Sequence, residues 1–270
     1  LREQNWAPLP VKPSSIDAVI LTHAHLDHSG YLPKLVKDGF RGPILASAAT
    51  RDVAEIILRD SGHIQEKDAE QTNRYGYGKH KPALPLYGVQ DAGRAMERFV
   101  STPFHTSVEL PGGARLTLRR AGHLLGAATA EVTWNGTKIL FSGDLGRYGD
   151  ATMVDPEPGE EADYVVVEST YGDRRHDSRD PTEALGEVIE RTTARGGTVV
   201  IPAFAVGRAQ SLLYHIWRLK QAGRIGLTPI YLDSPMATNA TDLLHAHLED
   251  HRMPAEACDA RRPERIRRPS

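Results

Sequence analysis

The stretch Thr22-His23-Ala24-His25-Leu26-Asp27-His28-Ser29-Gly30 decides the fold, because it places three imidazoles and a carboxylate directly after the apolar run 17–21. That run predicts a buried strand. Alternate side chains of an extended chain share a face, so His23, His25 and Asp27 are expected to point together, while His28 approaches from another direction. A chance cluster of polar loop residues is the alternative. The spacing favours a metal site, in which one short loop serves two metals.

Two further candidate ligands follow apolar strands downstream. His123 lies in Ala-Gly-His-Leu-Leu-Gly at 121–126, and Asp144 lies in Phe-Ser-Gly-Asp-Leu-Gly at 141–146. Neutral imidazoles and carboxylates suit Zn²⁺ when thiolates are absent. The chain has a single cysteine, Cys258, so a cysteine-rich site and an internal disulfide are both excluded. Any metal site must therefore be built from histidines and carboxylates.

Composition bounds the class of protein. The 270 residues, 40% hydrophobic and 25% charged, predict a globular chain with one large or two modest domains. No run reaches the length of a membrane span and residues 1–6 do not form a signal peptide, so we expect no membrane partner and a cytoplasmic location. The single cysteine fits a reducing compartment. The net charge of -2 means that any site for a polyanion must be local.

The first two thirds of the chain alternate helix and strand signals. Helices are expected at 30–38, at 50–60 with Thr50 as the cap, and at 91–99. Strands are expected at 43–46, 107–110, 115–120, 127–134, 138–141 and, buried, 164–168, with a hairpin turn at Asn135-Gly136. Residues 62–90 predict an exposed excursion whose tyrosines and lysines at 75–81 are open to a polyanion, although a solvated loop is favoured.

A domain boundary is expected after Tyr171-Gly172, where the chain turns charged. Beyond it we predict helices at 182–195 and 207–222 and strands at 198–201 and 229–232, which implies a parallel sheet with crossover helices. The expected domains are residues 1–178 and 179–270. His176 is assigned to surface or packing, and the basic run 261–268 to a disordered terminus rather than to an RNA-binding arm.

Taken together, these motifs resemble those of the metallo-β-lactamase fold nucleases with a β-CASP domain. The residues that carry the resemblance are 22–28, Gly122-His123, Ser142-Gly143-Asp144 and Glu168-Ser169-Thr170-Tyr171-Gly172, with Ile201 to Gln210 and Leu232 to Ala237 in support. Within that family the chain is most similar to prokaryotic RNA-processing exonucleases related to the cleavage and polyadenylation specificity endonuclease subunit. The resemblance implies an α/β fold, a metallo-β-lactamase αββα sandwich lacking its N-terminal strands, followed by the start of an inserted β-CASP α/β domain.

The resemblance also implies residue roles. His23, His25 and His123 would hold one Zn²⁺, Asp27 with His28 a second, and Asp144 would bridge the two. Asp27 and Glu168 would act in catalysis. The expected contacts to single-stranded RNA are Ser169, Thr170, Tyr171 and Arg208. The alternatives from the residues alone are a surface charge or a helix-entry partner for Glu168, a turn for Ser169, Thr170 and Tyr171, and a salt bridge for Arg208.

The implied function is zinc-dependent hydrolysis of RNA phosphodiester bonds through a metal-bridging hydroxide. A catalytically inactive scaffold subunit, or a hydrolase of the same fold acting on DNA or a small molecule, is the alternative, and a homodimer is left open. The family's opening hairpin and its later histidine motifs B and C have no counterpart in these residues. We therefore expect the chain to be a fragment that carries an incomplete site.

Overall fold

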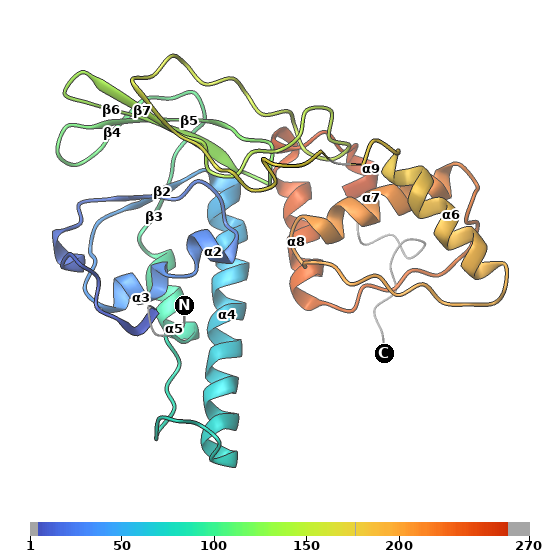
Figure 1. Cartoon of the computed structure of the whole chain (residues 1–270), viewed down its shortest axis with the longest axis horizontal. Coiled ribbons are helices and arrows are strands. Elements are labelled where there is room, and N and C mark those ends of the chain that lie inside the picture. The colour runs from blue at the N-terminus through green and yellow to red at the C-terminus, as the bar shows by residue number, and fades with distance from the viewer. Residues whose placement is uncertain (1–4, 176, 259–270) are drawn as a thin grey trace. The chain divides into compact units, whose positions relative to one another are not determined.

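The strand before the histidine motif forms as β1 (Val19–Ile20), the first of three parallel strands. The computed structural model describes residues 5–175 and 177–258, and the expectations for His176 and for the run 261–268 lie outside them. The 3-10 helix η1 (Pro13–Ser15) precedes β1, and the sheet has the order β1-β2-β3, with β2 (Ile44–Ala46) and β3 (Phe99–Ser101). Helices α3 (Leu32–Lys37), α4 (Ala48–Tyr75) and α5 (Val89–Met96) pack together beside it (Figure 1). The helix predicted to reach Phe99 ends early, because Phe99 joins β3.

A second sheet has five strands in sequence order. They are β4 (Val108–Glu109), β5 (Arg115–Arg120), β6 (Ala128–Trp134), β7 (Thr137–Phe141) and β8 (Tyr164–Val166). The first four pair antiparallel and β8 runs parallel to β7. The hairpin predicted at Asn135-Gly136 is confirmed, since both residues have positive φ, 48° and 80°, as its type of turn requires.

The two sheets share one hydrophobic core. Leu45 of β2 packs with Leu116 and Leu118 of β5 and with Ala128 and Ala130 of β6. All five side chains are buried. Helix, sheet and sheet thus form successive layers, which confirms the predicted α/β class and leaves the loops after β1, β5 and β7 free to carry polar residues.

Helix α4 is much longer than the sequence indicates. It begins at Ala48 with Ser47 as its cap, not Thr50: the Ser47 hydroxyl accepts from Thr50 N at 3.1 Å. It then continues to Tyr75, so the excursion predicted from residue 62 is wrong up to that point. Gly62 suggested a break, but it allows close packing, because a Cβ there would lie 2.8 Å from the backbone of Gly88.

Strand β8 forms where expected, but the prediction that it is buried is wrong. The exposed fractions of Tyr164, Val165 and Val166 are 63%, 59% and 54%. The strand lies at the edge of its sheet, beyond β7. An apolar run shows that a segment favours burial, and it does not show what covers it.

The described chain divides into two units. Unit 1 comprises residues 1–148 and 155–168, and unit 2 comprises 149–154 and 169–270. The chain therefore crosses between the units three times. The domain boundary predicted at 178 stays a prediction. Among the helices of 5–175 and 177–258, none combines the length and apolarity needed to span a bilayer.

Unit 2 is helical where it is described. Its elements are α6 (Pro181–Thr193), α7 (Arg208–Gln221), α8 (Pro235–Ala246), η2 (Leu248–Asp250) and α9 (Ala255–Cys258). The strands predicted at 198–201 and 229–232 are wrong, since only a single bridge residue, Tyr231, occurs there. Val199 and Ile230 pack as loop residues against the α6–α7 core. Both segments have strand composition, but a strand also needs a paired neighbour, which composition does not report.

Candidate metal centre

The loop after β1 buries the first expected ligand. The exposed fraction of His23 is 0%, and His25 is half-buried two residues later. The Ser29 hydroxyl closes the loop by donating to the carbonyl of Ala24 at 2.9 Å. A buried serine thus fixes the backbone from which both imidazoles project.

The extended geometry predicted for this motif ends at His25, which caps the short helix α2 (Leu26–Ser29). Asp27 and His28 therefore lie on a helical turn, and the prediction that Asp27 shares a strand face with the first two histidines is wrong. The Asp27 side chain is 79% exposed, and its Oδ2 lies 3.6 Å from His28 Nε2. The turn still brings both side chains to the side of the cluster.

His123 lies on a tight loop between β5 and β6. The loop is closed by Ala121 N donating to Ala127 O at 2.9 Å. Gly126, with φ +76°, turns its carbonyl toward the start of α4, where the hydroxyls of Ser47 and Thr50 donate to it at 2.7 and 2.8 Å. The N-terminus of the long helix thereby fixes the loop that carries His123.

Asp144 follows β7 on a loop that only glycine permits. Gly143 has φ +54°, and a Cβ at that position would lie 2.8 Å from the Thr22 side chain. Gly146 N donates to Ala121 O at 2.8 Å, so the Asp144 loop lies directly against the His123 loop. Glycine at both positions is what lets three loops meet.

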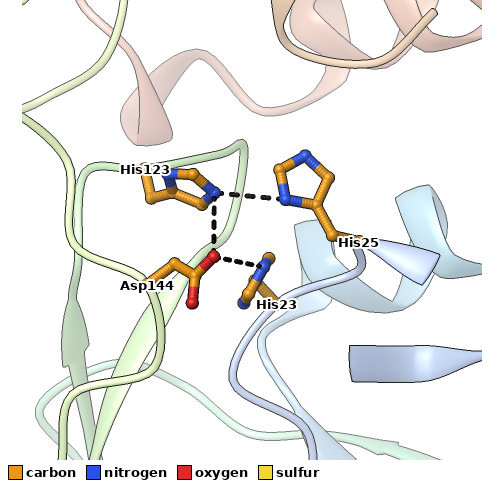
Figure 2. A group of neighbouring side chains, drawn as sticks. All are labelled: His23, His25, His123 and Asp144. Atoms are coloured by element: carbon orange, nitrogen blue, oxygen red, sulfur yellow. Dashed lines mark hydrogen bonds and ion pairs between the residues drawn. The ribbon is translucent and has the colours of Figure 1, made fainter. Parts of the chain in front are cut away.

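These loops bring four side chains to one point (Figure 2). His23, His25, His123 and Asp144 each offer a ligand atom, and these atoms all lie within 4.8 Å of one another. His123 Nε2 is 3.1 Å from His25 Nδ1 and 3.6 Å from Asp144 Oδ2. The other carboxylate oxygen, Oδ1, lies 3.3 Å from His28 Nε2. Asp144 therefore faces the histidine triad with one oxygen and His28 with the other.

The imidazoles are held in their neutral form. Burial, reinforced by the neighbouring imidazoles, lowers the pKa of His23 to about 2. Burial is also the largest cause that lowers the pKa of His25 and of His123, although Asp144 opposes it. A neutral ring presents a free lone pair, which is the form that binds a metal ion.

The cluster fits a divalent metal ion. His23 Nε2 is buried and has no hydrogen-bond partner. It lies 3.7 Å from Asp144 Oδ2, but a neutral imidazole forms no ion pair at that distance. A buried nitrogen without a partner is costly. An ion bound by three imidazole nitrogens and a carboxylate oxygen would satisfy it, and this donor set is one that zinc accepts.

Glu168 has a structural task at this centre. Its Oε1 accepts from Leu145 N at 2.6 Å, next to Asp144. Its own backbone N donates to Ser142 Oγ at 3.0 Å. The carboxylate thus holds the loop that presents Asp144, and its charge also acts on the pKa of His123.

The residues predicted to bind RNA lie in unit 2, outside this cluster. Ser169, Thr170 and Tyr171 are exposed and form a turn, closed by Gly172 N donating to Ser169 O at 3.0 Å. The Arg174 guanidinium lies 5.7 Å from the centre of the Tyr171 ring. The hydrogen bond and the ring contact fit the structural alternative for the triplet, which is a turn, and a role in binding stays a prediction.

Arg208 opens helix α7 and is exposed. The alternative considered for Arg208 is a salt bridge. Among the residues that the structure describes, no carboxylate forms an ion pair with its guanidinium. The nearby Gln210 is buried and bonds Gly207 N at 2.7 Å, Ala205 O at 3.0 Å and Ala237 O at 3.1 Å. The motif around Arg208 therefore joins α7 to α8, whatever else it does.

Sequence reasoning missed the residues that position the ligands. Thr22 Oγ1 lies 3.3 Å from His23 Nδ1, where it can orient the ring. Ser47, which donates its hydroxyl to Gly126 O, lies 79 positions from it in the sequence. Thr22 stands next to a candidate ligand and offered a signal. The pairing of Ser47 with Gly126 depends on the fold and offered none.

Comparison with known proteins finds two matching family domains and several similar proteins. Residues 6–194 match the Metallo-beta-lactamase superfamily and residues 209–269 match the Beta-Casp domain. The chain is 37% identical over 241 residues to "Ribonuclease TTHA0252" of Thermus thermophilus, which covers 89% of the chain and 51% of that protein. It is thus similar to a protein named as a ribonuclease.

Two more distant relatives come from a plant and an archaeon. "Cleavage and polyadenylation specificity factor subunit 3-I" of Arabidopsis thaliana is 35% identical over 84% of the chain and 31% of its own length. "Transcription termination factor FttA" of Methanothermobacter thermautotrophicus is 33% identical over 81% of the chain and 33% of its own length. The chain therefore spans from about a third to about half of the length of these relatives.

Proposed function

The chain belongs to the metallo-beta-lactamase superfamily and carries a Beta-Casp domain, and from that premise we propose that it hydrolyses phosphodiester bonds of single-stranded RNA with two Zn²⁺ ions. The observation that carries the proposal is the cluster of His23, His25, His123 and Asp144 with its partnerless buried nitrogen. The names of the relatives, a ribonuclease and a cleavage factor, support RNA as the substrate.

Each side chain has a task in this proposal. His23, His25 and His123 would hold one ion, Asp27 and His28 would hold the second, and Asp144, which faces both groups, would contact each. When bound, such ions supply an activated water and a counter-charge for a phosphoryl oxygen. The exposed carboxylate of Asp27 accepts a hydrogen bond from the attacking water and so orients it toward phosphorus.

Positioning falls to residues that do not touch the substrate. Glu168 would fix the Asp144 loop through Leu145 N, and Thr22 would fix the His23 ring. The catalytic role that the resemblance implies for Glu168 remains part of the proposal. The single cysteine is buried Cys258, which suits the reducing cytoplasm that we propose as the location. Ser169, Thr170, Tyr171 and Arg208 remain proposed contacts to the RNA backbone.

The test combines metal content with cleavage. We expect His25→Ala to lose bound zinc and to abolish cleavage of a labelled single-stranded RNA, while the thermal unfolding of the metal-free protein stays close to wild type. His63→Ala is the matched control, because His63 is exposed on α4 and away from the cluster. Unchanged zinc per chain in His25→Ala would overturn the ligand assignment.

The same assay separates the alternatives. An inactive scaffold would bind zinc poorly and cleave nothing. The presence of all four ligand residues, His23, His25, His123 and Asp144, argues against this alternative. Single-stranded DNA of the same sequence and a chromogenic ester serve as the other substrates. Faster turnover of either one than of RNA would contradict the proposed substrate.

A further inference from the structure

The far end of helix α4 carries a loop that the proposed chemistry does not use. The helix has 28 residues and extends past α3 and α5 (Figure 1). It ends at Gly76, which has φ +70° and donates its N–H to Thr72 O. Asn73 then ties down the loop that follows, donating to Ala83 O at 2.9 Å and accepting from Ala83 N at 2.7 Å. The loop is thus held at both ends.

This loop is strongly basic in a chain that is slightly acidic overall. No aspartate or glutamate occurs between Glu70 and Asp91, whereas the whole chain has a net charge of -2. We call the basic tip the six exposed residues Arg74, Tyr75, Tyr77, Lys79, His80 and Lys81. Among the described residues no carboxylate pairs with its lysines or its arginine. Their charge is therefore available to a partner.

The tip also exposes two aromatic rings. The exposed fractions of Tyr75 and Tyr77 are 67% and 68%. Tyr87 in the same segment is 1% exposed and donates its hydroxyl to Ser61 Oγ at 2.7 Å, so the segment buries the ring that the core needs. The Arg74 guanidinium lies 5.6 Å from the centre of the Tyr75 ring. Tyr75 and Tyr77 are thus mainly exposed, and their rings are accessible to a partner.

From this arrangement we propose that the basic tip binds single-stranded RNA, as a second contact for the substrate of the proposed function, on which this inference rests. Exposed rings stack on unpaired bases, and lysines and arginines beside them neutralise the phosphates between those bases. Double-stranded nucleic acid hides the faces of its bases and has no use for the tyrosines. A membrane surface or an acidic protein would use the charge without the alternation of ring and cation.

The tip lies far from the candidate metal centre. Helix α4 begins beside Gly126 of the His123 loop, and at about 1.5 Å per residue its 28 residues extend about 40 Å. At roughly 3.4 Å per nucleotide of a stacked strand, about 12 nucleotides span that length. A strand held at the metal centre therefore reaches the tip only if it is long, so the tip sets a length preference for the substrate.

The experiment compares a 30-nucleotide with a 5-nucleotide single-stranded RNA. Fluorescence anisotropy measures the binding of each RNA to the EDTA-treated protein. We expect Tyr75→Ala with Tyr77→Ala to weaken binding of the long RNA roughly tenfold for each ring. Lys79→Glu with Lys81→Glu should weaken it at least tenfold and lower the salt dependence of log K by about 1.4, two phosphates' worth. The short RNA cannot join the tip to the metal centre, so its binding should weaken less than that of the long RNA.

Matched controls use exposed residues elsewhere in the chain. Trp6→Ala removes an exposed ring, and Lys12→Glu with Arg195→Glu reverses two exposed charges. If the tip variants bind the long RNA as the wild type does, the inference is overturned while the proposed function stands. Equal losses for heparin or for duplex RNA would overturn single-stranded RNA as the ligand. If the zinc-loaded wild type binds RNA at the tip without cleaving it, the proposed function fails and the tip does not.

Discussion

Glu168 acts on the metal centre through the backbone of another residue. Its hydrogen bond to Leu145 N fixes the loop that presents Asp144, and a peptide N–H needs a strong acceptor there. Outer partners of this kind orient a metal ligand without touching the ion. At the scale of a single residue, the centre therefore depends on its ligands and also on the residues that hydrogen-bond to the loops carrying them.

We therefore predict that Glu168→Ala lowers zinc affinity about 10 to 100-fold. Glu168→Gln keeps an acceptor oxygen and should lose less. Competition with a fluorescent chelator measures both affinities. Wild-type zinc affinity in Glu168→Ala would leave the carboxylate without a positioning role, whatever happens to the rate of cleavage.

His215 gives unit 2 a pH dependence. Its Nδ1 lies 2.9 Å from Thr182 Oγ1, which accepts from the Arg218 guanidinium at 3.0 Å and can donate its own hydrogen to the neutral ring. Burial, followed by the charge of Arg218, lowers the pKa of His215, although Asp180 and Asp150 oppose this. The folded chain thus disfavours the protonated imidazole.

The sign of the effect follows from linkage. An unfolded histidine titrates near pH 6.5, so below that pH the unfolded chain binds a proton that the folded chain rejects. His215 alone should lower the free energy of unfolding by up to about 1.4 kcal/mol per pH unit as the pH falls below about 6.5. His23, His25 and His123 add a trend of the same sign, because their pKa values are lowered too. Urea unfolding at pH 7.5, 6.5 and 5.5 measures it, and His215→Gln is expected to reduce the slope by the share of His215. His245→Gln, which changes an exposed histidine of the same unit, should keep it.

The ligand candidates could be chosen from the sequence because their spacing is local. His23, His25 and Asp27 lie within five positions, and strand-to-loop signals indicated His123 and Asp144. The orientation of Asp27 could not be predicted, since this sequence is compatible with both a helical turn and an extended loop. The distances in the structure bring these side chains together, and their role as ligands stays a prediction.

At the scale of elements, the start of α4 and the His123 loop form one packed unit. Gly126 lies where a Cβ would be 2.4 Å from Thr50 N and 2.6 Å from Ser47 Oγ. Its positive φ adds a conformational requirement. The cap of the helix and the turn of the loop therefore use the same few atoms.

Gly126→Ala should cost about 2 to 4 kcal/mol, from a left-handed backbone plus a steric overlap, and should weaken zinc binding. Gly136→Ala is the matched control, because Gly136 has a similar φ of +80° with nothing within 4 Å of its Cβ position. It should cost only about 1 to 2 kcal/mol and leave zinc affinity unchanged. Equal losses in the two variants would show that the overlap at Gly126 relaxes freely.

The elements that the sequence predicted well are those with local signals. The turn at Asn135-Gly136 needs a backbone conformation that few residues adopt, so these two residues were enough to predict it. Helix α4 was cut short because its second half is polar and contains Gly62, and packing against Gly88 overrides both. The segments 198–201 and 229–232 have strand composition, but within the described residues they form nothing beyond the single bridge residue Tyr231. Composition does not report which segments pair.

At the scale of the whole molecule, strand β8 leaves an apolar edge. Its three residues are all more than half exposed, and exposed edge strands pair readily with other chains. We predict concentration-dependent self-association that Val165→Lys reduces. Sedimentation velocity over a range of concentrations measures it, with Val200→Lys as the control, since Val200 is 85% exposed in a loop. Sedimentation of Val165→Lys that matches wild type would rule out β8 as the contact, and the homodimer stays a prediction.

The three crossings between the units bear on how the protein can be dissected. Residues 149–154 belong to unit 2, where Arg252 N donates to Thr152 O at 2.8 Å and Met153 pairs with His251, yet they precede 155–168 of unit 1 in the chain. No single cut in the gene yields both modules intact. A truncation at 168 leaves residues 149–154 without Arg252 and His251, with which they pair, and a product that starts at 169 lacks residues 149–154. Modular exchange with a relative would have to transplant the two segments of a unit together.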